Sequence, residues 1–166
     1  FRSMKTIIKL FLGSIFALIM TGCGTSKNTS QFENEQYDIK EKLEKASFEF
    51  STNYVVPMGN FPPRYLTSNY SVKLSGDTLY SYLPYFGVAY VAPMNSSDSP
   101  LIFTTKDFDY QLTKGKKAGN WNVKIDVKDK RKQLRYILNI YNNGKADLIV
   151  NDFSRQSIRF QGEIEK

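Results

Sequence analysis

The stretch WNVKIDVKDKRKQLRYILNIYNNGKADLIV, from Trp121 to Val150, decides the fold. Apolar side chains take every second position in three successive runs: Trp121, Val123, Ile125 and Val127; then Leu134, Tyr136, Leu138 and Ile140; then Ala146, Leu148 and Val150. A period of two places them on one face of a β-strand. The charged segment 129–132 separates the first two runs. Asn142-Asn143-Gly144 separates the last two, and Asn-Gly favours the type I′ turn of a hairpin. The stretch therefore predicts three antiparallel strands.

The same alternation continues on both sides of this stretch. Strand-like runs precede it at residues 48–56, 70–74, 78–83 and 101–112, and a last strand follows with Ile158, Phe160, Gly162 and Ile164 on one face. Seven or eight strands joined by short turns predict a mainly β fold, an antiparallel meander with one apolar face. Burying that face requires the sheet to curl into an open barrel or to fold over as a sandwich. The pattern leaves both alternatives open.

One helix is expected before the strands. Ser30 and Glu33 have the spacing of a capping box, so the helix should begin near Gln31 and end near Ala46. Its apolar positions share one face: Phe32, Ile39, Leu43 and Ala46. The pairs Asp38–Lys42 and Glu41–Lys45 are spaced for ion pairs on the solvent side. This N-terminal helix is expected to pack against the sheet and to cover an end or an open edge.

The beginning of the chain resembles a bacterial lipoprotein signal peptide. Two lysines precede a short apolar run, and Met20-Thr21-Gly22-Cys23 resembles the lipobox that is cleaved before a lipidated cysteine. The run is about half of the roughly 20 residues that a spanning helix needs, although a short anchor or a buried helix is the alternative. We expect residues 1–22 to be the signal peptide, with 1–3 a translation-start artefact, 23–30 a lipidated tether and 31–166 a single β domain.

Cys23 is the only cysteine, so an internal disulfide is excluded and lipidation is the expected use of its thiol. Stable anchoring takes more than one acyl chain, as in bacterial lipoproteins. By similarity to known lipoproteins, Gly24 in place of Asp after the cysteine implies export to the outer membrane. The lack of an acidic cluster there implies that the protein faces the periplasm.

Composition narrows the possible activities. The formal charge is +7, but removal of the signal peptide leaves 20 basic and 16 acidic side chains, so the excess gives little reason to expect nucleic-acid binding. The chain has no histidine, which excludes serine–histidine and cysteine–histidine nucleophiles and removes a common metal ligand. We expect no metal, no cofactor and no catalytic residue that the sequence identifies.

Two motifs resemble a known family. Leu83-Pro84-Tyr85-Phe86-Gly87-Val88-Ala89-Tyr90-Val91-Ala92-Pro93 and Ser154-Arg155-Gln156-Ser157-Ile158-Arg159-Phe160-Gln161-Gly162 resemble segments of the Bacteroides-group lipoproteins of domain-of-unknown-function family 4251 (DUF4251). The resemblance covers about Ala46 to Ile164. It implies a Bacteroides-type envelope lipoprotein with a mainly β domain, and it brings no assigned activity and no catalytic residues.

Two groups of side chains are candidates for a site. The first is Tyr82, Tyr85, Phe86, Tyr90 and Arg64, whose rings and charge could line a groove for a sugar or a peptide. The alternative is that these rings cap the end of the barrel around a Pro-Gly corner. The second is the pair Asp107 and Asp109, which a strand would place on one face, for acid–base chemistry or calcium; two solvated surface acids are the alternative.

These observations favour a non-enzymatic, lipid-anchored envelope protein. Its partners would be the membrane, through lipid on Cys23, and a periplasmic glycan, small molecule or protein. A second hypothesis is a hydrolase or lyase of envelope glycan that uses carboxylates and tyrosines. A third is a structural or inhibitor-like module that docks on another envelope protein.

Overall fold

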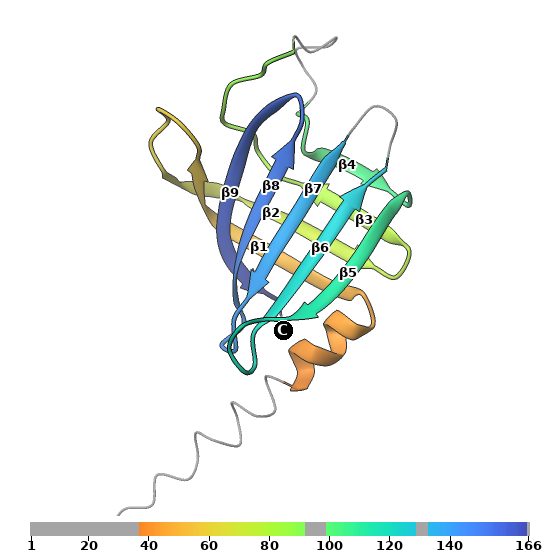
Figure 1. Cartoon of the computed structure of the whole chain (residues 1–166). Coiled ribbons are helices and arrows are strands. Elements are labelled where there is room, and N and C mark those ends of the chain that lie inside the picture. Colours follow the sequence, from red (N-terminus) through yellow and green to blue (C-terminus); the bar gives the residue numbers. More distant parts are fainter. Residues whose placement is uncertain (1–36, 92–98, 129–132, 166) are drawn as a thin grey trace, which may run out of the picture. The chain divides into compact units, whose positions relative to one another are not determined.

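Nine β-strands form one antiparallel sheet in the computed structural model, which describes residues 37–91, 99–128 and 133–165 (Figure 1). The strands are β1 (Ser47–Pro57), β2 (Arg64–Ser75), β3 (Thr78–Tyr82), β4 (Ile102–Thr105), β5 (Phe108–Lys114), β6 (Trp121–Val127), β7 (Leu134–Ile140), β8 (Lys145–Asp152) and β9 (Arg155–Ile164). The mainly β prediction is confirmed, as are the three strands of the opening stretch and their antiparallel pairing in chain order. At Asn142-Asn143-Gly144 the expected type I′ turn does not form, because Gly144 has a positive φ of +80° and Asn143 does not.

The first strand and the last strand pair with each other in the middle of the sheet. The strand order is β4-β3-β2-β1-β9-β8-β7-β6-β5, so two meanders are joined by the antiparallel pair of β1 and β9. Of the nine described strands, β4 and β5 follow one another in the chain yet form the two edges. The sheet curls until it is nearly closed (Figure 1). The chain therefore adopts the open-barrel alternative.

The expectation of one continuous strand from Leu101 to Leu112 is wrong. The strand is interrupted at residues 106–107, where the chain turns a corner. There the backbone N–H of Asp107 donates to the Thr105 hydroxyl at 3.1 Å, and the Lys128 N–H donates to the Asp107 carbonyl at 3.0 Å. β4 then pairs with β3, whereas β5 pairs with β6. The core-facing positions change from odd to even across the break, from Leu101 and Phe103 to Phe108 and Tyr110, so this shift of phase in the sequence marks the corner. This break makes nine strands instead of seven or eight.

The core fills the inside of the curved sheet. Alternation is visible in the burial of each strand; along β7, Leu134, Tyr136, Leu138 and Ile140 are buried. Tyr136 is fully buried, and its hydroxyl bonds to the Ser81 hydroxyl at 2.9 Å, which itself donates to the Leu101 carbonyl at 2.7 Å. Burial raises the pKa of the Tyr136 phenol well above its usual range. The phenol therefore stays protonated and serves as a donor inside the core.

A helical segment at residues 37–44 packs against one end of the sheet (Figure 1). Leu43 is fully buried in the core cluster, and the Tyr110 hydroxyl on β5 donates to the Leu43 carbonyl at 2.8 Å. The two expected ion pairs form: Lys42 Nζ lies 3.1 Å from Asp38 and Lys45 Nζ lies 2.6 Å from Glu41. The expected cap at Ser30, the first turn of the helix, the signal peptide and Cys23 lie outside the described residues.

Candidate functional site

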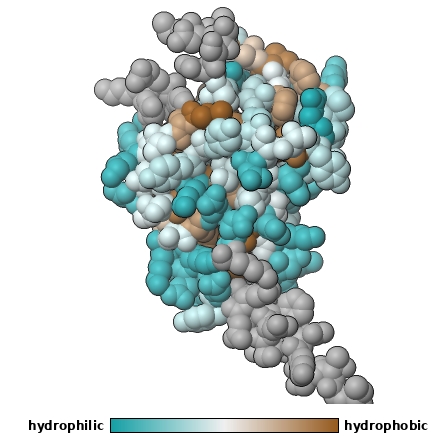
Figure 2. All heavy atoms as spheres, turned by 180° about the vertical axis from the view of Figure 1, so that it is seen from behind, coloured by the Kyte–Doolittle hydropathy of each residue, from teal (hydrophilic) through white to brown (hydrophobic). Residues whose placement is uncertain are grey.

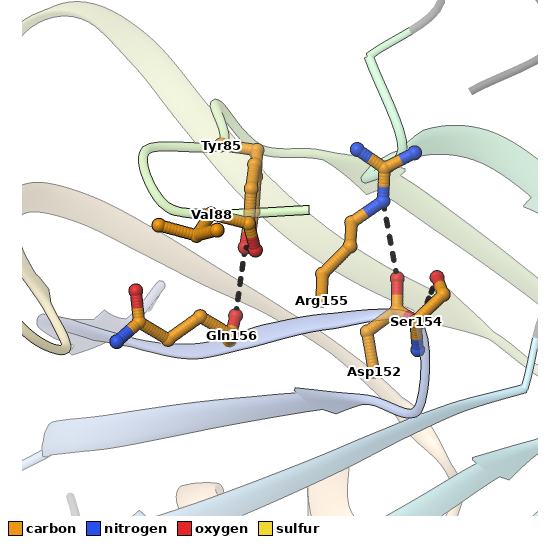
Figure 3. Close-up of polar contacts among 6 residues, drawn as sticks. All are labelled: Tyr85, Val88, Asp152, Ser154, Arg155 and Gln156. Atoms are coloured by element: carbon orange, nitrogen blue, oxygen red, sulfur yellow. Dashed lines mark hydrogen bonds and ion pairs between the residues drawn. The ribbon is translucent and has the colours of Figure 1, made fainter. Parts of the chain in front are cut away.

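The segment after β3 is fastened to the beginning of β9, so the two family-like motifs meet in space. Ala89 forms a bridge with Arg155, the Tyr90 N–H donates to the Ser154 carbonyl at 2.8 Å, and the Gln156 N–H donates to the Val88 carbonyl at 3.0 Å. We call this contact between residues 85–90 and 152–156 the motif junction (Figure 3). Residues 88–90 thus pair with the beginning of β9 like a short additional antiparallel strand.

Tyr85 is the central side chain of the motif junction. Its hydroxyl lies 2.9 Å from the Gln156 carbonyl and 3.1 Å from the Val88 carbonyl (Figure 3). Burial raises the pKa of this phenol, so it stays protonated and donates to these carbonyls. A Cβ on Gly87 would lie 2.6 Å from the Tyr85 hydroxyl oxygen. Gly87 therefore leaves room for the ring, and the Pro-Gly corner solves a packing problem.

Asp152 organises the other half of the motif junction. One of its oxygens accepts hydrogen bonds from the Ser154 N–H at 2.8 Å and from the Ser154 hydroxyl at 2.7 Å. Its other oxygen lies 3.5 Å from Nε of Arg155, whose guanidinium stands 5.6 Å from the centre of the Tyr85 ring. Figure 3 shows the terminal nitrogens of Arg155 pointing away from Asp152. These contacts hold the turn between β8 and β9 in one conformation.

The five candidate side chains from the sequence take part in several separate contacts. Arg64 stands 4.7 Å from the centre of the Phe86 ring, so these two come together. Tyr85 is committed to the motif junction, Tyr82 stacks on Tyr70 at 5.4 Å, and Tyr90 is 67% exposed. Figure 2 shows hydrophobic side chains at the upper end of one face and a second group lower on it, with hydrophilic side chains around them. None of the five lines the cavity that the structure forms around β1, β2, β8 and β9.

That cavity is a half-open groove of about 1280 Å³ on the wall of the sheet. Five segments line it: β1 around Thr52, β2 from Tyr65 to Ser71, the turn between β7 and β8, the beginning of β8, and the end of β9. We call it the wall groove. Its floor is the place where β1, β9 and β8 run side by side, which is also where the first and last strands meet.

A break in strand pairing creates one side of the wall groove. Thr52 pairs with Tyr70 and Tyr54 pairs with Tyr65, so the single residue Asn53 on β1 stands opposite residues 66–69 on β2. Bulges of this kind bend a strand and leave residues outside the ladder. Here the extra residues are Leu66, Thr67, Ser68 and Asn69, and all four line the groove. The bulge thus forms the wall that faces Tyr141 and Asn143.

Asp147 is the most buried charged group in the wall groove, with 7% of its surface exposed. The Tyr141 hydroxyl donates to its Oδ2 at 2.7 Å, and Gln161 Nε2 and Arg159 lie 3.1 Å and 3.0 Å from its Oδ1. Burial opposes ionisation of Asp147, but these hydrogen bonds and the guanidinium outweigh burial and hold the pKa of Asp147 below its usual range. The carboxylate therefore stays ionised and fixes the side chains that surround it.

The pair Asp107 and Asp109 forms no site. Both side chains are exposed, and Asp109 lies 2.8 Å from Lys128 Nζ in an ion pair that is half exposed on both sides. Each of the carboxyl groups with a shifted pKa in the described ranges (Asp77, Asp126 and Asp147) has its pKa lowered. Within the part of the chain that is described, no group of three or more acids or cysteines could hold a metal ion.

Sequence reasoning did not find the wall groove. Its floor depends on the pairing of Thr52 with Gly162, which are far apart in the sequence, and one strand alone does not predict that pairing. The polar run Thr67-Ser68-Asn69 between Leu66 and Tyr70 was the available signal, because it interrupts the alternation of β2. Residues 37–91, 99–128 and 133–165 contain no helix long and apolar enough to cross a membrane.

Comparisons with known proteins agree with the arrangement of strands. Residues 30–164 match the family model described as a domain of unknown function, DUF4251. The crystal structure of a DUF4251 family protein from Bacteroides eggerthii DSM 20697 is similar, with 17% sequence identity and a TM-score of 0.56. The match covers 79% of this chain and 87% of that one. At this identity the likeness shows the fold alone. A search of curated proteins gives no match.

Proposed function

The chain belongs to the DUF4251 family, and from this premise we propose that it is a lipid-anchored envelope protein whose β domain binds a ligand or partner and catalyses no reaction. In this proposal the lipid is attached to Cys23, and the domain faces the periplasm from the outer membrane of a Bacteroides-type bacterium. The support for anchoring is the sequence from Met20 to Cys23 with its preceding apolar run.

The observation that carries the binding role is the wall groove. A groove of about 1280 Å³ lies on the outside of the sheet, its floor consists of paired strands, and some of its polar groups are held by hydrogen bonds. Asp147 holds Tyr141 and Gln161 in place through hydrogen bonds of 2.7 and 3.1 Å. Preformed concave sites with a few fixed polar groups are typical of ligand binding.

The electrostatics favour binding over glycan hydrolysis. A glycosidase needs one carboxylic acid with a raised pKa and a second carboxylate across the scissile bond. Asp147 is the buried acid of the wall groove, and its pKa is lowered, so it cannot deliver a proton near neutral pH. Asp107 and Asp109 lie outside the groove.

Replacing Cys23 with Ser tests the anchor. Cells that express the full chain or the variant are labelled with an alkyne fatty acid, fractionated, and analysed by intact mass. The full chain should carry label and remain with the outer membrane, whereas Cys23→Ser should carry none and lose the membrane fraction. Ser26→Ala, three residues further along, is the control and should behave as the full chain. Equal membrane retention and mass for Cys23→Ser would refute the anchor.

Hydrogen exchange tests the binding role without assuming a ligand. The full chain is mixed with periplasmic extract separated into sugar, peptide and protein fractions, and amide protection is measured along the chain. At least one fraction should slow exchange in residues 65–71 and 141–147, which line the wall groove. Residues 108–114 of β5 lie outside the groove and serve as the internal control. Unchanged exchange with every fraction would contradict a binding role.

A further inference from the structure

We propose that the wall groove binds a neutral oligosaccharide. This inference rests on the proposed binding function and names the class of ligand. The groove is larger than the roughly 300–1,000 Å³ of a typical small-molecule pocket, and it is open along one side. A ligand that extends beyond a single small ring, such as a short sugar chain, suits a groove of this size and form.

The side chains of the wall groove match the hydroxyl groups of sugars. Hydroxyl and amide groups line it from both walls and from the floor: Ser51, Asn53, Thr67, Ser68, Asn143 and Gln161. Hydroxyls and amides both donate and accept hydrogen bonds, as sugar hydroxyls do. A lipid or an apolar peptide segment would leave these groups unpaired at a cost, because buried polar groups need partners. The lining therefore favours a polyhydroxylated ligand.

Tyrosine rings provide the surfaces on which a sugar ring can lie. Tyr54, Tyr65, Tyr70 and Tyr141 all line the wall groove. Tyr65 is 79% exposed, and its ring meets Tyr54 edge-on with centres 4.9 Å apart. A sugar has apolar C–H faces that pack on an aromatic ring, and the phenol supplies a hydrogen bond at the rim. The exposed Tyr65 ring is the expected platform.

The charges of the wall groove select a neutral ligand over an anionic one. Its lining includes the acids Glu49, Asp147, Glu163 and Glu165, but Lys145 is its one basic residue. The chain as a whole has a formal charge of +7, so this acidic patch is local. An anionic glycan would meet like charges, which oppose association.

A cationic ligand is also a poorer fit, because the protein already supplies cations to two of these acids. Arg159 lies 3.0 Å from Asp147, and Lys73 lies 3.6 Å from Glu49. An arriving lysine or arginine would compete with these existing ion pairs for the carboxylates. Asp147 and Glu49 are therefore better suited to accept hydrogen bonds from sugar hydroxyls or to hold neighbouring groups in place.

Asp147 acts as a positioning residue in this site. It accepts from the Tyr141 hydroxyl and from Gln161, and both of these side chains line the wall groove. The Tyr141 proton is committed to Asp147, so its oxygen lone pairs face a ligand as acceptors. Gln161 donates one proton to Asp147, which leaves its second N–H and its carbonyl for a ligand. Two recognition groups are thus fixed in advance.

Titration calorimetry on the full chain, in a detergent without a sugar headgroup, tests the proposal. The probes are neutral hexasaccharides of glucose, mannose, xylose and N-acetylglucosamine, with hexagalacturonate and hexalysine as charged comparisons. At least one neutral hexasaccharide should bind, and its Kd should change less than about twofold between 50 and 500 mM salt, because screening weakens only charged pairs. Tyr65→Ala should raise that Kd at least fivefold.

Tyr90→Ala is the matched control, since Tyr90 is 67% exposed and lies outside the wall groove. It should leave the Kd within twofold of the unchanged chain. Tighter binding of hexalysine or hexagalacturonate, an equal effect of the two tyrosine variants, or no binding of any neutral hexasaccharide at millimolar concentration would overturn the proposal. Exchange protection of the wall groove by a peptide or protein fraction, together with no sugar binding, would leave the proposed binding function standing and refute the sugar.

Discussion

Gly162 is the position where one added methyl group should most disturb the sheet. It lies on β9 between Thr52 of β1 and Ala146 of β8. A Cβ built on Gly162 would overlap the Ser51 carbonyl oxygen and would lie 2.9 Å from both the Ser51 carbonyl carbon and the Thr52 Cα. These atoms belong to backbone, which cannot turn aside as a flexible side chain can. The bulge at Asn53 brings β1 this close, so only glycine fits.

The cost of Gly162→Ala follows from this clash. Overpacking in a well-packed region costs about 1–3 kcal/mol, and a clash with the backbone of β1 belongs at the upper end, about 3 kcal/mol. For a domain of this size each kcal/mol lowers Tm by roughly 2–4 °C, so the expected loss is roughly 6–12 °C. Since Gly162 also lines the wall groove, the displaced β1 should change the exchange of groove residues.

Urea unfolding followed by circular dichroism and by the fluorescence of Trp121 measures this loss. Gly76→Ala is the matched control: a Cβ there meets nothing within 4 Å, and its φ of +59° costs an alanine about 1 kcal/mol. The midpoint for Gly162→Ala should fall well below that for Gly76→Ala with the same slope. A loss for Gly162→Ala no larger than that for Gly76→Ala would refute the account of the bulge.

Three further substitutions probe other contacts. Ser81→Ala should destabilise by about 1–3 kcal/mol because it leaves the buried Tyr136 hydroxyl without an acceptor, and adding Tyr136→Phe should recover part of that in a double-mutant cycle. Because its folded pKa is lowered, Asp147 stabilises the fold above its unfolded pKa of about 3.9, and this stabilisation is lost as the pH falls through the folded pKa. Asp147→Asn should therefore lower the free energy of unfolding at pH 7 and lower it less in acid, as measured by unfolding curves at several pH values. A loss of stability that is the same at every pH would contradict this. Tyr85→Phe should cost about 1 kcal/mol and speed hydrogen exchange at the amides of the motif junction, and unchanged exchange would count against that role.

Local patterns predict the strands of this chain because each strand has one buried face. The stretch from Trp121 to Val150 alternates cleanly, and its pairing through two adjacent turns follows from chain order alone. Prediction of a single strand at residues 101–112 fails because it passes over a change of phase at residues 106–107, where the apolar positions change from odd at Phe103 to even at Phe108. It also cannot reveal that β9 returns to pair with β1, since that pairing depends on the curvature of the whole sheet.

The two family-like motifs are recognisable in the sequence, but the sequence does not show that they contact each other in the fold. Residues 85–90 are a candidate ligand-binding segment in the sequence because aromatic rings offer stacking faces and hydroxyls, and an end cap is the alternative. In the structure the Tyr85 hydroxyl lies within hydrogen-bond distance of two backbone carbonyls, and the guanidinium of Arg64 lies over the Phe86 ring. The alternative of an end cap around a Pro-Gly corner explains Tyr85 better than ligand binding does. Tyr82 and Tyr90 stay exposed and carry no such structural task.

The two ends of β9 belong to different regions: its beginning lies in the motif junction and its end lines the wall groove. The beginning of β9 holds the segment after β3 through Ser154, Arg155 and Gln156. The end of β9 supplies Gln161 and Gly162 to the groove. Because one continuous strand joins both regions, fastening its beginning also fixes the register of its end against β1 and β8. A motif that looks like a binding segment can therefore serve binding indirectly, by holding rigid the strand on which a separate groove is built.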